Sequence, residues 1–268
     1  MIRSRLAPTP SGFLHIGNAF NFLLTQQLVR RQNGILRLRI DDRDMPRFRQ
    51  EYLEDIFESL HWLEIVWDEG PQHAEDERLH FSQELQTARY DALLSQLVLT
   101  GKVFACNCSR KTMHAMACSC REKQLPLHTP DVAWRVATPA DDVLVQDQKR
   151  GDVFISLERE MKDFIVRRRD GIPAYQVVSL ADDLTHQINF IVRGEDLLPS
   201  TAAQLYLAEL IGANSFSETQ FLHHPLLTDS HGEKLSKSSG APSLQMMRRS
   251  GITKKEILVQ LEPLLAAW

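Results

Sequence analysis

The first 40 residues predict a particular order of elements. Residues 2–7 and 35–40 are runs of strand length, the second with apolar Ile35, Leu36, Leu38 and Ile40, and the apolar positions within residues 19–31 recur at helical spacing. Asn33 and Gly34 form a typical helix stop before the second run. A strand, a helix and a strand of these lengths imply a right-handed crossover and a parallel sheet. We therefore expect an α/β fold.

The loop between the first strand and the helix, within residues 5–18, has the composition of a ligand-binding turn. Pro8 and Pro10 stiffen it, while Gly12 and Gly17 allow a ligand to approach the backbone. Unpaired amides at the start of the helix favour phosphate, and His15 adds a side-chain donor. Residues 41–44 follow the second strand, so they should lie at the same edge of the sheet. Taken alone, this loop is equally consistent with a simple tight turn.

Composition excludes several classes of protein. The chain has 268 residues, 43% of them hydrophobic, which is enough for one large domain with an insertion or for two domains. It lacks a basic leader and any run of about 18 apolar residues, so we expect a cytoplasmic protein with no membrane contact. A net charge of −4 argues against holding nucleic acid by bulk electrostatics, although paired arginines and lysines allow a local basic face. No feature indicates an obligate protein partner.

All four cysteines fall within one short window. They form two Cys-x-Cys pairs, Cys106 with Cys108 and Cys118 with Cys120. Such clustering in a cytosolic chain predicts thiolate ligands for a tetrahedral structural zinc rather than disulfides. Two alternatives stay open: a remnant that binds no metal, and a site in which His114 replaces one cysteine.

Helical and strand periodicity continues through the rest of the chain. Residues 51–63 and 77–100 predict helices, the second with a core stripe of Leu85, Tyr90, Leu93, Leu94 and Leu97. Residues 125–164 contain three short strand signals, at 133–136, 143–145 and 153–157. Beyond them we expect strands at 164–166, 189–193 and 220–223, and helices at 175–182 and 197–211.

A lysine-rich loop reads Lys234-Leu235-Ser236-Lys237-Ser238. By itself such a loop is usually solvated surface. Together with His15-Ile16-Gly17-Asn18 it resembles the paired signatures of class I aminoacyl-tRNA synthetases. Residues 5–12, 38–44, 173–175 and 192–196 resemble elements of the glutamyl branch in the expected order, so the resemblance covers residues 5–238.

This resemblance implies a fold and a domain order. The fold would be a Rossmann-like parallel sheet with an inserted, zinc-bearing module of the acceptor-binding type, and without an anticodon-binding domain. Residues 1–100 and 164–223 would form the two halves of the catalytic domain, and residues 101–163 the inserted module. Residues 224–268 would carry the lysine loop and a helical segment.

The resemblance also assigns roles to individual residues. The ATP site would comprise His15, Gly17, Asn18, Lys234, Ser236 and Lys237, with His15 and Lys237 catalytic and Mg2+ accompanying the nucleotide. The glutamate site would comprise Arg5, Leu6, Ala7, Pro8, Thr9, Asp41, Tyr175 and Arg193. In it the two arginines bind carboxylates, Tyr175 donates a hydrogen bond and Asp41 faces the ammonium group. The family normally has glutamate in place of Asp41. Taken singly, Arg193 is also consistent with a structural ion pair, and Tyr175 with a packed aromatic residue.

Among glutamyl enzymes, the chain most resembles the short glutamyl-queuosine tRNA(Asp) synthetases. These enzymes activate glutamate without tRNA and esterify it to queuosine in the anticodon of tRNA(Asp). Their zinc segment matches residues 106–110 and 120–121, although they often place tyrosine at the third ligand, so Cys118 is the weakest correspondence. Three alternatives remain: a compact glutamyl-tRNA synthetase charging the tRNA 3′ end, a catalytically idle RNA-binding module, and a small-molecule adenylyltransferase.

Overall fold

The structure is a computed structural model that describes residues 1–43, 46–108, 118–227 and 242–268. The chain divides by its internal contacts into two compact units. Unit 1 comprises residues 1–86, 188–196 and 222–268, and unit 2 comprises residues 87–187 and 197–221. The domain boundaries expected from the sequence stay a prediction.

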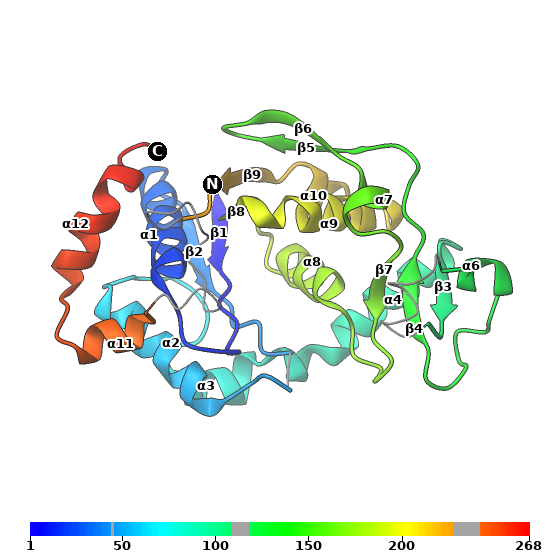
Figure 1. Ribbon diagram of the computed structural model, residues 1–268, viewed down its shortest axis with the longest axis horizontal. Coiled ribbons are helices and arrows are strands. Elements are labelled where there is room, and N and C mark those ends of the chain that lie inside the picture. The colour runs from blue at the N-terminus through cyan, green and yellow to red at the C-terminus, as the bar shows by residue number, and fades with distance from the viewer. Residues whose placement is uncertain (44–45, 109–117, 228–241) are drawn as a thin grey trace. The chain divides into compact units, whose positions relative to one another are not determined.

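The parallel crossover predicted at the N-terminus is present in unit 1. β1 (Arg3–Leu6) pairs in parallel with β2 (Ile35–Leu38), and α1 (Ile16–Arg31) connects them (Figure 1). The turn into β2 needs glycine, because a Cβ on Gly34 would lie 2.4 Å from the side chain of Ile2. This arrangement confirms the α/β class inferred from the strand, helix and strand pattern.

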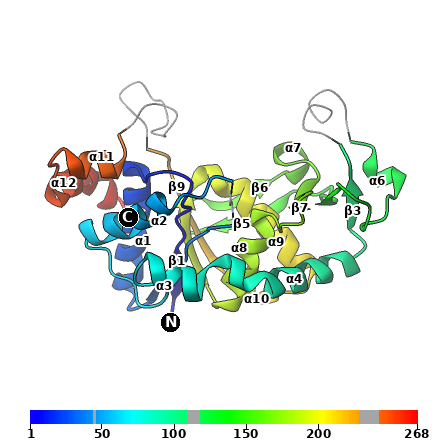
Figure 2. The same ribbon diagram turned by 90° about the horizontal axis from the view of Figure 1, so that it is seen from below.

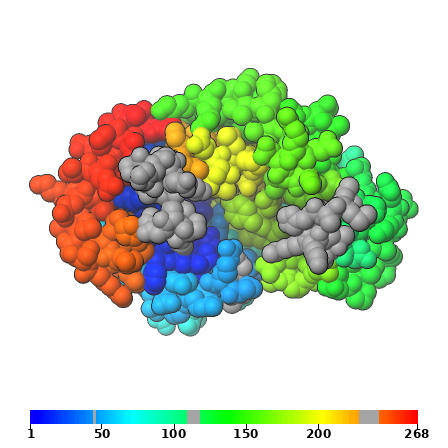
Figure 3. Space-filling model, in the orientation of Figure 1, coloured from blue at the N-terminus to red at the C-terminus, as the bar shows by residue number. Residues whose placement is uncertain are grey.

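Unit 1 has an apolar core around α1. Phe20, Leu24 and Val29 of this helix are buried together with side chains from both strands. Two helices after residue 241, α11 (Leu244–Arg249) and α12 (Lys254–Leu265), pack against α2 and α1 respectively (Figure 2). In the space-filling view these two helices appear in orange and red beside the blue N-terminal residues (Figure 3). The other elements of unit 1 are α2 (Gln50–Trp62), α3 (Ala74–Asp76), η1 (Glu77–Phe81), η2 (Gln83–Gln86) and β8 (Phe190–Gly194).

The single helix expected over residues 77–100 is wrong. The chain forms the π-helical turn η1, breaks at Ser82, where ψ is 135°, and continues as the 3-10 turn η2 before α4 (Thr87–Leu99) begins. The break coincides with hydrogen bonds from Ser82 and Gln83 to the carboxylate of Asp42, which divert this stretch from helical pairing. Leu85 consequently lies outside the core, with 56% of its surface exposed, whereas the four other predicted core residues are buried.

Unit 2 contains an antiparallel sheet in the order β3, β4, β7. β5 (Val143–Asp147) and β6 (Gly151–Ile155) form an antiparallel hairpin, and β5 pairs in parallel with β9 (Gln220–His224) through Asp147 and Phe221. β9 is divided between the units, and its last three residues belong to unit 1, where β8 is its neighbour. No helix in the described ranges is both long and apolar enough to cross a bilayer. The other elements of unit 2 are β3 (Val103–Cys106), α6 (Cys120–Lys123), β4 (Ala133–Val136), β5 (Val143–Asp147), β6 (Gly151–Ile155), α7 (Leu157–Glu160), β7 (Phe164–Arg167), α8 (Tyr175–Thr185), α9 (Leu198–Leu210) and α10 (Asn214–Ser217), with η3 (Glu195–Leu197) spanning the boundary.

Candidate functional site

His15 caps the N-terminus of α1. Its Nδ1 accepts a hydrogen bond from the backbone amide of Gly17 (3.1 Å), and its own amide donates to Oδ1 of Asn18 (3.0 Å). The two bonds form a reciprocal capping box. Because Nδ1 is an acceptor, the neutral imidazole carries its proton on Nε2, which leaves that atom as a donor. Glycine also leaves space for the ring, since a Cβ on Gly17 would lie 3.0 Å from the imidazole.

The loop before His15 is joined to the end of β2. The carbonyl of Pro8 accepts from the amide of Asp41 (2.9 Å), and the carbonyl of Leu6 accepts from the amide of Arg39 (2.9 Å). Leu6 and Pro8 are buried, while Ala7 and Thr9 of the same stretch are half-buried. The predicted loop and the predicted acidic stretch therefore meet at one edge of the sheet, as expected from strand polarity.

The three predicted residues of the lysine loop, Lys234, Ser236 and Lys237, lie outside the described residues. The chain that follows them contacts the His15 loop directly. Ser243 forms a β-bridge with His15, and the amide of Leu244 donates to the carbonyl of Leu14 (2.8 Å).

α11, which starts at Leu244, is held in place by an arginine. Arg248 donates to Asp55 (2.8 Å), Glu58 (2.6 Å) and Ser59 (3.1 Å) of α2. The side chain of Asp55 is only 2% exposed, so this is a partly buried, charge-assisted tie. This tie holds α11, the first helix after the lysine loop, against α2.

The two arginines expected to bind carboxylates are both buried in unit 1. Arg5 lies on β1 with 5% exposure and Arg193 on β8 with 4% exposure. The strands are neighbours, since the amide of Asn189 donates to the carbonyl of Arg3 (3.0 Å) and the amide of Arg3 donates to Oδ1 of Asn189 (2.8 Å). A guanidinium group can bind a carboxylate with two parallel hydrogen bonds, so arginine is a suitable residue type for recognising an acidic ligand.

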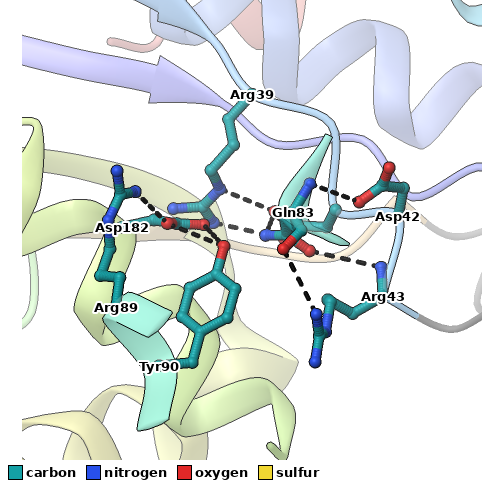
Figure 4. A network of polar contacts seen from close by, with 8 residues as sticks. Arg39, Asp42, Arg43, Gln83, Arg89, Tyr90 and Asp182 are labelled. Atoms are coloured by element: carbon teal, nitrogen blue, oxygen red, sulfur yellow. Dashed lines mark hydrogen bonds and ion pairs between the residues drawn. The ribbon is translucent and has the colours of Figure 1, made fainter. Parts of the chain in front are cut away.

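Asp41 sits at the end of β2 with its carboxylate held by two donors. Arg39 donates from Nε to Oδ1 (2.7 Å) and from Nη2 to Oδ2 (3.3 Å), and Gln83 donates from Nε2 to Oδ1 (3.2 Å) (Figure 4). Both members of the ion pair are nearly buried, with side-chain exposures of 7% and 10%. Sequence reasoning assigned no role to Arg39 or Gln83, and the second of these is 42 positions away from Asp41 in the chain.

Asp42 is fixed by the same break in the chain. Ser82 Oγ donates to its Oδ2 (2.6 Å) and the amide of Gln83 donates to its Oδ1 (3.0 Å). Burial raises the pKa of the Asp42 carboxyl, against the effect of these hydrogen bonds.

Glu77 adds a third, deeply buried carboxyl group. The residue is 1% exposed, and neither carboxyl oxygen has a hydrogen-bond partner among the described residues. Burial, reinforced by the charges of Asp42 and Asp41, raises the pKa of Glu77 to about 9. Glu77 is therefore neutral at physiological pH.

Tyr175, the remaining residue predicted for the amino-acid site, belongs to unit 2. It is the first residue of α8 and is 41% exposed. The buried carboxylate of Asp182 joins this helix to α4. It accepts hydrogen bonds from Arg89 (2.8 Å) and from the hydroxyl of Tyr90 (3.0 Å), both on α4 (Figure 4).

The four cysteine sulfurs of unit 2 converge. All lie within 4.8 Å of one another, and three Sγ–Sγ distances are 3.4, 3.7 and 3.8 Å. Four thiolates at about 2.3 Å from a tetrahedral zinc would be about 3.8 Å apart. The cluster therefore fits a zinc ion and includes Cys118, the weakest correspondence in the sequence. His114, the alternative ligand, lies outside the described residues.

An arginine supports the backbone of this cluster. Nη2 of Arg169 donates to the carbonyls of Asn107 and Cys108 (2.8 Å each), and Nη1 pairs with Asp131 (2.9 Å). These contacts fix the first Cys-x-Cys turn, as outer contacts commonly do around metal ligands.

Comparison with known proteins gives consistent results across nearly the whole chain. A family model described as tRNA synthetases class I (E and Q), catalytic domain, matches residues 1–133 and 130–262. The chain is 34% identical to a glutamyl-Q tRNA(Asp) synthetase of Nitratidesulfovibrio vulgaris, covering 96% of this chain and 84% of that protein. It is 32% identical to a glutamate–tRNA ligase of Caldicellulosiruptor saccharolyticus, over 100% of this chain and 58% of that protein.

A solved structure gives the same result for the fold. The glutamate-tRNA synthetase of Elizabethkingia anophelis superposes with a TM-score of 0.75 at 26% identity. The match covers 89% of this chain and 53% of that one, so the chain spans about half the length of that synthetase.

Proposed function

Because the chain belongs to the catalytic-domain family of class I tRNA synthetases for glutamate and glutamine, we propose that it activates L-glutamate with ATP in the absence of tRNA. The glutamyl group then passes from the adenylate to the queuosine of the tRNA(Asp) anticodon. Similarity to a glutamyl-Q tRNA(Asp) synthetase supports this acceptor.

The observation that carries the proposal is the set of charged side chains buried in unit 1. Arg5 and Arg193 are buried on neighbouring strands, and the anchored carboxylate of Asp41 follows β2. Glutamate has two carboxylates and one ammonium group, so two guanidinium groups and one carboxylate complement it. In this proposal Leu6, Ala7, Pro8 and Thr9 line the pocket. Tyr175, which the resemblance assigns as a donor to the substrate, belongs to unit 2, and its role stays a prediction.

Activation requires a carboxylate oxygen of glutamate to attack the α-phosphate of ATP while pyrophosphate leaves. With an ordinary pKa of about 4, that carboxylate is already ionised, so no general base is needed. Catalysis then depends on orientation and on stabilising charge at the phosphate oxygens. His15 Nε2 and the side chains of Lys234, Ser236 and Lys237 are the proposed donors. Gly17 and Asn18 are proposed to line the site at the start of α1, since their amides already donate to Nδ1 (3.1 Å) and to the carbonyl oxygen (2.9 Å) of His15. Mg2+, bound with ATP, supplies additional positive charge at the phosphates.

The segment that returns from the lysine loop supports this assignment. Ser243 is six positions beyond Lys237 and bridges to His15, and α11 is tied to α2 by Arg248. The residues that follow the lysine loop therefore contact the loop that contains His15. In unit 2 we propose that Cys106, Cys108, Cys118 and Cys120 hold a structural zinc.

The deciding experiment locates the ester on the tRNA. The protein is incubated with ATP, labelled glutamate and tRNA(Asp), and nuclease digestion separates the anticodon fragment from the 3′ end. We expect label on the anticodon fragment, and none with tRNA(Asp) from cells that lack queuosine. Label on the terminal adenosine would instead show 3′-end charging.

Charging of the tRNA 3′ end is the second candidate, and the 32% identity to a glutamate–tRNA ligase over the whole chain favours it. A catalytically idle RNA-binding module would show no glutamate-dependent exchange of pyrophosphate into ATP. That exchange therefore separates both enzymes from the idle module, and the position of the label separates the enzymes from each other.

A further inference from the structure

Gln83 contacts three consecutive residues at the end of β2. Its Nε2 donates to Oδ1 of Asp41 (3.2 Å) and its amide donates to Oδ1 of Asp42 (3.0 Å). Its Oε1 and its carbonyl oxygen accept from the amide and from Nη1 of Arg43, each at 3.3 Å. Gln83 is itself 2% exposed. The segment that interrupts the expected helix therefore serves as a clamp on residues 41–43 (Figure 4).

The clamp has a consequence for the charge on Asp41. Arg39 already gives this carboxylate a cationic partner at 2.7 Å. A second cation would further weaken the attraction of Asp41 for an ammonium group. The side-chain amide of Gln83 is uncharged, so it orients the carboxylate of Asp41 without neutralising its negative charge.

The orientation of the carboxylate matters more for aspartate than for the glutamate that the family normally has in place of Asp41. Aspartate is one methylene shorter, so its carboxylate reaches a ligand over a narrower range of positions. Arg39 and Gln83 both donate to Oδ1, which fixes this oxygen from two directions. Two donors on one oxygen restrict rotation of the carboxylate, which reduces the entropy lost when a ligand binds.

We propose that Gln83 is a positioning residue for the amino-acid site, which fixes Asp41 in the orientation that receives the substrate ammonium group. This inference rests on the proposed binding of glutamate near Asp41. It assigns Gln83 an effect on binding of the ammonium group, because the hydrogen bonds described above join it to residues 41–43.

Calorimetric titration with two ligands tests the inference. L-Glutamate carries both carboxylates and the ammonium group, whereas glutarate carries only the carboxylates. For Gln83→Leu we expect the Kd of glutamate to rise about 3- to 10-fold, the range expected for one lost hydrogen bond, with the Kd of glutarate unchanged. Gln83→Met keeps a side chain of similar length but removes the donor without adding charge, and the same selective loss is expected. Gln50→Leu, on the exposed face of α2, is the matched control.

The outcomes separate this inference from the proposed function. Asp41→Asn should reduce the preference for glutamate over glutarate. If it does not, the placement of the ammonium group at Asp41 is wrong, whatever the Gln83 variants do. If Asp41→Asn acts as expected but both Gln83 variants keep the wild-type preference, or weaken both ligands equally, the positioning role of Gln83 is overturned. Thermal melting of each variant shows whether it is folded.

Discussion

The imidazole of His15 lies over the backbone of Gly17 and accepts a hydrogen bond from its amide at 3.1 Å. This contact thereby orients the ring, leaves Nε2 to carry the proton of the neutral imidazole, and leaves little room for a side chain at residue 17. The start of α1 and the imidazole are thus held together as one group, which is the group proposed to bind the phosphates of ATP.

Gly17→Ala tests this coupling. The new Cβ would be 3.0 Å from the imidazole ring, so the ring must move by a few tenths of an ångström. We expect kcat/KM for ATP to fall about 10- to 100-fold, as small misplacements of catalytic groups do. The melting temperature should hold or rise, since alanine favours helix over glycine by about 1 kcal/mol. Unchanged ATP kinetics in pyrophosphate exchange would refute the coupling.

His15→Ala can be compared with Thr253→Ala. Both residues form a capping box, at the starts of α1 and α12. Each substitution should lower the free energy of unfolding by about 1 kcal/mol in denaturant titrations. Only His15→Ala should abolish pyrophosphate exchange, because only His15 is proposed to contact ATP. Equal rates of pyrophosphate exchange in the two variants would show that His15 only caps the helix and has no role in catalysis.

Lys237→Ala should abolish formation of the adenylate without changing the melting temperature. The lysine is proposed to stabilise charge on the phosphates, and a neutral side chain cannot do so. Lys255→Ala, on the exposed surface of α12, is the control and should be as active as the unmodified protein. If the Lys237→Ala variant were active, Lys237 would not be needed for formation of the adenylate, and the assignment of the lysine loop would be wrong.

The cysteine cluster predicts about one zinc per chain by elemental analysis. Cys118→Ser should lower the zinc content, whereas His114→Ala should not. Cys108→Ser should make the segment around residues 106–120 more sensitive to proteolysis, with a smaller effect on ATP binding, because the proposed ATP site is in unit 1. Loss of zinc from His114→Ala alone would show that the four sulfurs are not the ligand set.

Glu77 predicts a pH dependence of stability. Its pKa is about 9 in the folded protein, against an ordinary value of 4.5. Between these values the unfolded chain loses its proton while the folded protein keeps it, so the contribution of Glu77 to stability falls as pH rises from about 4.5 to about 9. Glu77→Gln should therefore increase the free energy of unfolding at pH 8.5 by about 2 kcal/mol or more, and much less at pH 5. Glu75→Gln, an exposed neighbour, should have the same effect at both pH values.

Features encoded in short stretches were predictable. The spacing of apolar residues gave the strand, helix and strand order of β1, α1 and β2, and their lengths required a parallel pairing. The cysteines lie within fifteen positions, so little folding is needed to bring their sulfurs together. The helix over residues 77–100 was mispredicted because local periodicity carries no information about Asp42, which accepts hydrogen bonds at its break.

By itself the sequence determined the α/β class and the cysteine cluster, because each depends on residues close together in the chain. Only the tertiary structure decided that Asn189 lies beside Arg3, that Gln83 clamps Asp41, and that Arg248 ties α11 to Asp55. These contacts join residues 42 to 193 positions apart. They form only when burial of the shared apolar core offsets the entropy of closing such long loops, and no short stretch of sequence encodes that balance.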